Sequence, residues 1–315
     1  MLLSIIIPLY NAEKYIKACL DSIYSEGSAE ADFEVVVVDD GSCDDGAAIV
    51  ADYARQHDNL KLIRQKNRGA SAARNRGLEH ARGAWVWFVD ADDKIEAGVL
   101  KTIRDSDLES VEVICFNYRE ILRDRTVDHR LFDREEMLDG VAYFHRFGNT
   151  FLWNKLMRRD VLKHPFLDGT KNLEDLYFCL QNLLPCKRIK VLPIEGYCYN
   201  HTNAASTSLN LSEENLLKLS EDTLTIQKHI LDDMSTISDA YRSIYEDILT
   251  QTTAGHLYSL LRYYPLRRLR YVIRVYRQWG IYPVRRRTDN RRMNVFIRLA
   301  NCRVLLLMYG WIRNL

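Results

Sequence analysis

Acidic side chains follow two apolar, β-branched runs of this 315-residue chain, at the point where each run ends. The run Val35–Val38 leads into Asp39–Ser42, and the run Trp85–Val89 leads into Asp90–Asp93. Short runs of this kind, bounded by turn residues, are typical of strands buried on both faces of a parallel sheet. Carboxylates at the carboxyl ends of such strands meet at the crevice where open α/β sheets bind ligands. Because like charges repel at close range, these acids need a positive partner, and a divalent cation carrying a nucleoside diphosphate fits that need.

Two further segments accompany the acids, so that the first third of the chain contains Ser4–Asn11, Asp39–Asp44, Asn67–Gly77 and Asp90–Asp93 in that order. Together, in order and approximate spacing, these segments resemble the motifs of the family 2 nucleotide-sugar glycosyltransferases. Any one segment alone would be a weak signal, but the four make a specific one. The resemblance is strong over about residues 1–105, extends less strongly to about residue 210 and is absent beyond. It implies a GT-A fold and transfer of a sugar with inversion.

The resemblance places the nucleotide of the donor at the ends of the first two strands. Pro8, Tyr10 and Asn11 follow the first strand, with Tyr10 beside the base. Asp39 is the expected acceptor for a base N–H, and Asp40 lies nearby. Without the other motifs, Asp40 and the Gly-Ser pair after it would be interpreted as a turn, because Asp and Gly favour turns.

Arginines surround the glycines of the third segment. An arginine offers a rigid fork of donors that suits phosphates and carbonyl edges, and helix N-termini favour anions. Arg74 matches the family position that reaches the donor nucleotide, whereas we expect Arg76 on a solvated helix face.

The segment Asp90–Asp93 predicts the metal site. Mg²⁺ and Mn²⁺ prefer oxygen ligands, and Mg²⁺ is typically bound by one or two carboxylates together with substrate phosphates. Alternation along an extended strand end puts Asp90 and Asp92 on the same side. We assign Asp92 as the metal ligand and Asp90 to the ribose or the metal's water shell, with Ala91 between them in the donor site. Asp93 is a possible contact to the acceptor or the diphosphate, or a cap for the following helix.

A general base is needed for the acceptor hydroxyl. Glu174 and Asp175, just before an aromatic residue, resemble the acidic pair that carries the base of inverting family members. We select Asp175, with Glu174 as the alternative. The family usually has a small residue where Leu173 stands, so the resemblance does not define the loop shape here. Taken alone, an acid pair that opens a helix is more often a complement to the helix dipole.

Three later residues are further candidates for contacts to the acceptor or the diphosphate. Trp153 could stack on a sugar face or lie in the core, and Lys155 could meet a phosphate. His201 follows a strand at a position where the family often has a basic residue near the diphosphate, although a lone histidine is usually structural.

The chain has two segments of opposite net charge. Residues 261–315 contain fourteen Arg, no Lys and one Asp, which gives +13; the chain's total of +1 leaves −12 for residues 1–260. In this segment Leu269, Val272, Ile273 and Tyr276 fall at helical spacing, and arginines fall on another face. This pattern predicts an amphipathic helix on an anionic membrane. The alternatives are an apolar face docked on the catalytic domain and nucleic-acid binding, which no recognised binding module supports; residues 294–312 could add an apolar contact.

The cysteines and the apolar stretches of the sequence indicate the cellular compartment of the protein. Seven scattered cysteines without a Cys-x-x-Cys pair point to a reducing environment. No signal-peptide pattern opens the sequence, and no charge-free apolar stretch approaches the roughly 18–20 residues that cross a bilayer. We therefore expect a cytoplasmic protein, peripheral at the inner face of the cell membrane.

Both strands and helices are needed to position these residues. The predicted strands are Leu3–Leu9, Phe33–Val38, Leu60–Ile63, Ala84–Val89, Val111–Asn117 and Ile189–Tyr199. The predicted helices are Ala12–Ser25, Gly46–His57, Ser71–Arg82, Glu96–Asp105, Asp133–Phe147 and Asn172–Leu183. Alternation of strand and helix predicts an α/β fold with a GT-A, Rossmann-like, mostly parallel sheet flanked by helices.

The domain organisation follows from the same pattern. Residues 1–212 form the expected catalytic domain, with a nucleotide-sugar-binding half at 1–117 and an acceptor half at 118–212. Residues 213–315 form an all-helical, Arg-rich C-terminal region.

The expected function is a Mn²⁺- or Mg²⁺-dependent inverting glycosyltransferase. It would move a sugar from a nucleoside-diphosphate sugar, in the first place a UDP-sugar, to a hydroxyl of a glycan or lipid-linked acceptor in cell-surface polysaccharide synthesis. One alternative is a non-catalytic, transferase-like partner in a polysaccharide assembly complex. Another is a phosphatase of the haloacid dehalogenase type, because an apolar strand ending in Asp-x-Asp also resembles its nucleophile motif.

Overall fold

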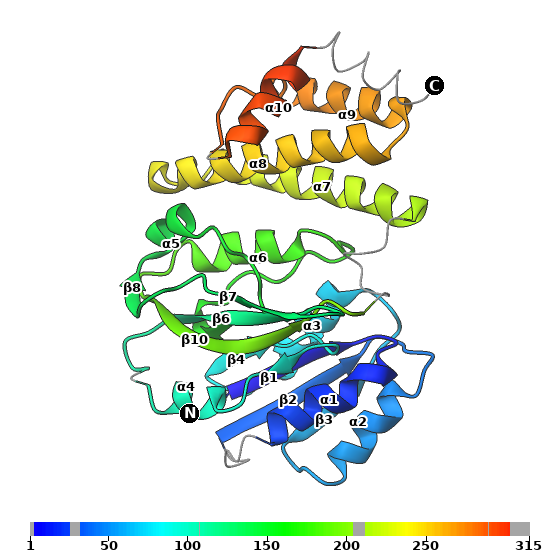
Figure 1. The fold of residues 1–315 in the computed structure, drawn as a ribbon, viewed down its shortest axis with the longest axis vertical. Helices are drawn as coiled ribbons and strands as arrows, with labels where there is room; N and C mark the ends of the chain where they lie inside the picture. The colour runs from blue at the N-terminus through cyan, green and yellow to red at the C-terminus, as the bar shows by residue number, and fades with distance from the viewer. Residues whose placement is uncertain (1–2, 26–31, 107, 204–211, 289, 303–315) are drawn as a thin grey trace. The chain divides into compact units, whose positions relative to one another are not determined.

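The computed structural model describes residues 3–25, 32–106, 108–203, 212–288 and 290–302. The chain divides into two compact units, Met1–Leu209 and Asn210–Leu315 (Figure 1). The first unit is an α/β layer structure and the second is helical.

Strands of the first unit form one mixed sheet, in which the described residues supply ten strands (Figure 1). Its parallel half consists of β1 (Leu3–Leu9), β2 (Phe33–Asp39), β3 (Leu60–Arg64) and β4 (Trp85–Phe88). The other strands are β5 (Lys94–Ile95), β6 (Val113–Ile121), β7 (Thr126–His129), β8 (Glu136–Leu138), β9 (Lys155–Arg158) and β10 (Ile189–Asn200). The order along the sheet is β3-β2-β1-β4-β9-β6-β10-β5, with β7 on β6 and β8 on β10.

The β-branched runs form central strands because both of their faces are covered. Val35 and Val37 of β2 point into the main core with α1 (Glu13–Tyr24), while Val36 and Val38 pack on the opposite face against Ala73 of α3 (Ala70–His80). Burial on both faces replaces the polar alternation of a half-exposed strand, which explains the continuous apolar pattern. The remaining helices of this unit are α2 (Gly46–Ala54), α4 (Val99–Arg104), α5 (Gly140–Arg146) and α6 (Glu174–Leu183).

The α/β class expected from the sequence is confirmed, and its parallel half matches the expected strands closely. The other half is more mixed than a mostly parallel sheet, because β9 runs antiparallel to both β4 and β6 while β10 is parallel to β6. One helix prediction is wrong: residues 136–138 of the predicted helix Asp133–Phe147 form β8, paired antiparallel with β10. Helix α5 begins only after Asp139, whose carboxylate accepts the Ala142 N–H as an N-cap.

The second unit has its own apolar core. It consists of α7 (Glu213–Asp233), α8 (Asp239–Tyr263), α9 (Leu266–Gln278) and α10 (Arg291–Asn301). Within the described residues, no helix is long and apolar enough to cross a membrane.

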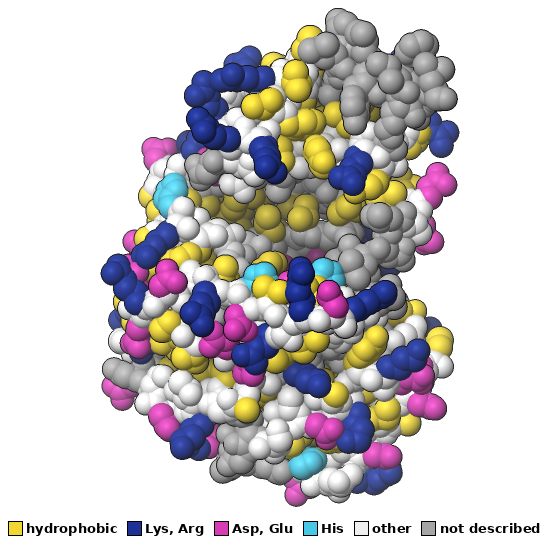
Figure 2. Space-filling model, viewed as in Figure 1, with side chains coloured by type: hydrophobic (Ala, Val, Ile, Leu, Met, Phe, Trp, Pro, Cys, Tyr) yellow, Lys and Arg dark blue, Asp and Glu magenta, His cyan; other side chains and the backbone are white. Residues whose placement is uncertain are grey.

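The apolar face of α9 corrects one expectation. Leu269, Val272, Ile273 and Tyr276 are at most 6% exposed and belong to the core of the helical unit. They are therefore not free to enter a bilayer. The arginine face of α9 stays exposed, and Figure 2 shows Lys and Arg side chains gathered over α10 and the loop before it. Of the predicted apolar stretch 294–312, residues 303–312 lie outside the described residues.

Candidate active site

The first donor loops are tied together at the carboxyl ends of β1 and β2. Asn11 adopts a left-handed conformation with φ 48°, which Asn tolerates better than most residues. Its backbone N–H donates to Ser42 Oγ, and its side-chain oxygen accepts the Cys43 N–H at 2.8 Å. Asp39 Oδ1 accepts the Ser42 N–H at 2.9 Å. The predicted residues Asn11 and Asp39 are thus brought to one edge, beside a Tyr10 side chain that is 52% exposed.

The neighbouring Asp40 has a different environment. Its carboxylate accepts the Gln65 side-chain amide, the Arg68 N–H and the Gly69 N–H at 2.7–2.9 Å. Gly69 has φ +90°, a region that favours glycine, and directly precedes α3. Asp40 therefore stabilises the turn that starts α3. Most of the lone pairs of its carboxylate already accept hydrogen bonds.

Arg74 of α3 is the centre of the acidic cluster. Its guanidinium donates to Asp90 Oδ1 at 3.0 Å, Glu174 Oε1 at 3.1 Å and Asp175 Oδ1 at 3.3 Å. The side chain is only 7% exposed. Burial opposes its charge, but the carboxylates of Asp175, Asp90 and Glu174 outweigh this and raise the pKa of Arg74. One cation of α3 thus joins the end of β4 to the start of α6, which lies a hundred residues after Arg74 in the chain.

The acids after β4 have distinct partners. Asp93 is buried; it accepts the Tyr197 hydroxyl at 2.8 Å and the Asn200 N–H at 2.7 Å. It does not cap a helix, since β5 follows it. Asp92 Oδ2 accepts the Asn203 side-chain amide at 2.7 Å. Burial, together with the charge of Asp90, raises the pKa of Asp92 and raises that of Asp93 well above its usual range.

This donor set fits a divalent cation held mainly by a substrate. Among the described residues, no group of three or more His, Cys, Asp or Glu is arranged to hold a metal ion. A single carboxylate, Asp92, with diphosphate oxygens as the other ligands is the pattern that Mg²⁺ commonly adopts. Burial is the main cause of the raised pKa values of Asp92 and Asp93, and the like charge of Asp90 adds a repulsion that a cation would relieve.

The candidate base opens helix α6. Burial, with the charges of Glu174 and Asp90, raises the pKa of Asp175 to about 8 against the lowering effect of Arg74. The Asp175 side chain is 29% exposed and that of Glu174 11%, so Asp175 is the more accessible of the two. Leu173 precedes them with φ 62°, a left-handed conformation. This geometry explains why a residue smaller than Leu would suit the position.

The remaining predicted contact residues are buried or already paired with other side chains. Trp153 is 6% exposed and stacked between other rings, so it lies in the core. Lys155 is fully buried, and its Nζ donates to Asn149 Oδ1, Asn154 Oδ1 and the Phe151 carbonyl at 2.6–2.8 Å. The prediction that Lys155 meets a phosphate is therefore not met in this structure. His201 Nδ1 is paired with Glu120 Oε1 at 2.6 Å.

Sequence reasoning missed several residues that support the site. Tyr197 holds Asp93 and the backbone N–H of Asp90, while Asn200 and Asn203 contact Asp93 and Asp92. One signal was available: a tyrosine inside a buried strand needs a partner for its hydroxyl. The asparagines gave no comparable signal.

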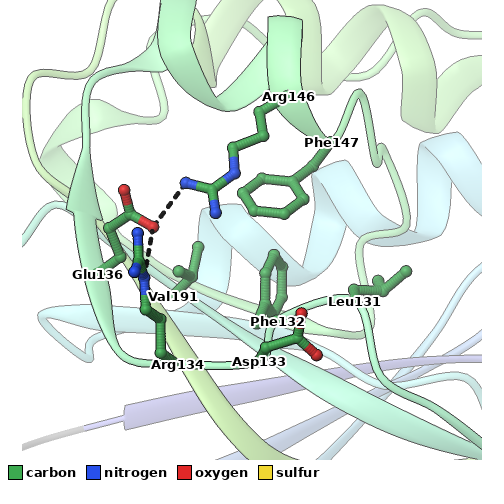
Figure 3. A pocket seen from close by; sticks show the side chains of 8 residues that line it. All are labelled: Leu131, Phe132, Asp133, Arg134, Glu136, Arg146, Phe147 and Val191. Atoms are coloured by element: carbon green, nitrogen blue, oxygen red, sulfur yellow. Dashed lines mark hydrogen bonds and ion pairs between the residues drawn. The ribbon is translucent and has the colours of Figure 1, made fainter.

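A separate cavity of about 580 Å³ lies near α5 (Figure 3). Phe132, Phe147 and Val191 contribute apolar walls, and Glu136 bonds Arg146 at 2.6 Å across it. None of the predicted site residues lines this cavity.

Comparison with known proteins found a family model, related sequences and solved structures. The sequence model of glycosyl transferase family 2 matches residues 4–166. An uncharacterized glycosyltransferase of Bacillus subtilis, EpsJ, is 28% identical over 220 residues, which cover 66% of this chain and 63% of the relative. The poly(ribitol-phosphate) beta-N-acetylglucosaminyltransferase TarS of Staphylococcus aureus is 33% identical over 205 residues, covering 63% of this chain and 35% of TarS. The chain thus spans less than two thirds of the length of these relatives.

Solved structures show the same fold. Residues 1–349 of S. aureus TarS, in complex with UDP-GlcNAc, superpose with a TM-score of 0.74 at 23% identity, covering 98% of this chain and 89% of that chain. A mannosyltransferase from Pyrobaculum calidifontis, in complex with GDP-Man and Mn²⁺, superposes with a TM-score of 0.56 at 18% identity, covering 99% and 86%. The predicted GT-A fold is confirmed. The family model covers more than half of the chain and includes all four donor motifs, and the protein therefore belongs to glycosyl transferase family 2.

Proposed function

We propose that this protein is an inverting, metal-dependent glycosyltransferase that uses a nucleoside-diphosphate sugar, in the first place a UDP-sugar. The observation that carries the proposal is the Arg74 cluster, which gathers Asp90 from the donor edge and the Glu174–Asp175 pair of α6 around one guanidinium. A donor site and a candidate base must lie this close for a hydroxyl to attack the anomeric carbon of a bound sugar.

The donor residues bind and orient the nucleotide. The exposed ring of Tyr10 is available to lie beside the base, and Asp39 is placed to accept a base N–H. Asp90 would serve the ribose and Asp92 a Mg²⁺ or Mn²⁺ ion on the diphosphate. When bound, such an ion stabilises negative charge on the leaving diphosphate.

Asp175 would accept the proton of the acceptor hydroxyl as its oxygen attacks the anomeric carbon, opposite the departing nucleoside diphosphate. A base with a pKa near the working pH can take up this proton and release it afterwards. Burial provides that pKa, about 8, and Arg74 keeps the carboxylate oriented.

Several relatives support this choice of donor without deciding the nucleoside. TarS was solved with UDP-GlcNAc and with UDP, whereas the archaeal mannosyltransferase was solved with GDP-Man and Mn²⁺. The family match also favours a transferase over the phosphatase alternative.

The acceptor would be a hydroxyl of a glycan or a lipid-linked glycan in cell-surface polysaccharide synthesis. We place the protein at the inner face of the cell membrane, attracted by the arginines of α9, α10 and the loop between them. Because the apolar face of α9 is buried, this attraction would be electrostatic, at about 1 kcal/mol per Arg close to an anionic surface.

The decisive measurement is the thermal stability of the protein with UDP, GDP, CDP or ADP, each with Mn²⁺ and with a chelator. Stabilisation by one nucleotide that depends on Mn²⁺ supports the donor site and identifies the nucleoside. No stabilisation by any of them contradicts the proposal.

A further inference from the structure

The aromatic residues beside the acidic cluster form an ordered stack. Trp153 is stacked nearly parallel to Phe151, Tyr197 and Tyr199, with ring centroids 4.8, 4.8 and 5.5 Å apart. Trp153 is 6% exposed, whereas Phe151 is 41% exposed. Phe151 is therefore the most exposed ring of the stack.

A series of contacts links this ring to polar groups. Tyr118 lies at about a right angle to Phe151, with ring centroids 5.9 Å apart, and stacks on His129 at 4.5 Å. Glu120 then joins His129 at 2.8 Å and His201 at 2.6 Å. Both histidines are about one-third exposed, so part of each imidazole is open to solvent.

Short contacts connect the stack to both halves of the candidate active site. Tyr197, under Trp153, donates its hydroxyl hydrogen to Asp93 and accepts the Asp90 N–H. On the other side, the Thr150 carbonyl accepts from Cys179 Sγ at 3.4 Å, and Cys179 lies one helical turn after Asp175 on α6.

The loop that carries Phe151 is also held in place. Lys155 Nζ binds the Phe151 carbonyl at 2.6 Å and the Asn149 side chain at 2.7 Å from a fully buried position. Phe151 is thus presented from a loop that buried hydrogen bonds hold in place.

From this arrangement we propose that the exposed face of Phe151 binds a pyranose ring of the acceptor, with Glu120, His129 and His201 as hydrogen-bond partners for its hydroxyls. The inference rests on the proposed function, since it names the acceptor side of the same site. A pyranose presents one face of C–H groups, which carry partial positive charge and are attracted to the negative face of an aromatic ring. Its hydroxyls lie around the rim of the ring, where planar carboxylate and imidazole groups can pair with them.

Saturation-transfer NMR on the full chain tests this platform. The probes are methyl β-glucoside, methyl β-galactoside and methyl β-N-acetylglucosaminide, each with and without Mn²⁺ and the four nucleoside diphosphates. Phe151→Leu keeps an apolar side chain but removes the ring, and Phe151→Trp keeps a ring. Met137→Ala is the matched control, because Met137 is 46% exposed on β8 of the same unit and lies outside the stack.

We expect transfer from the protein to the C–H protons of at least one pyranoside. Affinity should fall about five-fold in Phe151→Leu, the worth of a good ring contact, and remain within about two-fold in Phe151→Trp and Met137→Ala. Equal signals in wild type and Phe151→Leu, an equal loss in Phe151→Trp, or no pyranoside signal at all would overturn the platform.

Nucleotide stabilisation, measured on the same variants, separates this inference from the proposed function. Stabilisation by a nucleotide without any Phe151-dependent sugar signal removes the platform and leaves the transferase proposal standing. A Phe151-dependent sugar signal without stabilisation by any nucleotide contradicts the transferase proposal and leaves sugar binding at Phe151 standing.

Discussion

At the scale of single residues, the two acids that open α6 have different surroundings. Asp175 and Glu174 share Arg74, but Asp175 is more exposed and has a pKa near 8. A group that must exchange a proton with a substrate needs both properties. We therefore propose Asp175 as the base and Glu174 as its electrostatic neighbour.

Substitution of the two acids should separate these roles. Asp175→Asn should reduce the turnover rate by about 10²–10⁴-fold, the usual contribution of a general base, while leaving nucleotide stabilisation intact. Glu174→Gln should retain most of the turnover. Steady-state transfer rates, with thermal shifts as the binding control, check both; the reverse ranking would make Glu174 the base.

The pH dependence of the reaction should follow Asp175. Its carboxylate must be ionised to accept a proton, so kcat/KM should rise with pH up to about 8 and level off above it. Glu174 raises the pKa of Asp175, and Glu174→Gln should therefore move the inflection to lower pH. Rate profiles between pH 5 and 9 would show this; an unchanged inflection would argue against electrostatic coupling.

At the scale of elements, close packing of α3 on the central strand positions Arg74. A Cβ atom added to Gly77 of α3 would lie 2.3 Å from Ile6 Cγ2 of β1. The glycine therefore lets the helix approach the sheet closely, and Arg74 lies one turn earlier on the same helix.

Replacement of this glycine should be costly. Gly77→Ala should lower the free energy of unfolding by about 1–3 kcal/mol, because the added methyl forces α3 away from β1. Gly255→Ala in α8 is the control: no atom lies within 4 Å of the added Cβ, so it should raise that free energy by about 1 kcal/mol. Urea denaturation of both variants measures the contrast, and equal effects would contradict it.

The limits of sequence prediction also follow element by element. Strands β1, β2 and β4 could be predicted because burial on both faces leaves a continuous apolar run. Strand β8 could not, since three residues gain their conformation from pairing with β10 about fifty residues later. The same holds within the site: the type of Arg74 indicated an anion partner, but its contact with α6 depends on tertiary packing.

At the scale of the whole molecule, charge is unevenly distributed along the chain. Residues 261–315 carry a formal +13 against −12 for residues 1–260. Arginines on α9 and α10 are exposed while the apolar side of α9 is used in the core. An attraction to anionic surfaces would therefore depend on charge far more than on apolar insertion.

Binding to lipid vesicles should distinguish attraction by charge from apolar insertion. Vesicles with about one-third phosphatidylglycerol should co-sediment the protein at about 0.1 M salt and release it at about 0.5 M, where charges are screened over a shorter distance. Arg291→Glu with Arg292→Glu should weaken binding without altering transfer to a soluble acceptor. Binding that persists at high salt would indicate apolar insertion instead.

The aromatic stack has a consequence for redesign and for divergence between relatives. Tyr197 is at once the inner layer of the stack and the support of Asp90 and Asp93, so a change at this layer alters the donor site as well. The described contacts of Phe151, the most exposed ring, include none with these acids. On the proposed acceptor role of Phe151, a change at this ring would alter which acceptor binds while the contacts of Tyr197 with the donor-site acids stay unchanged.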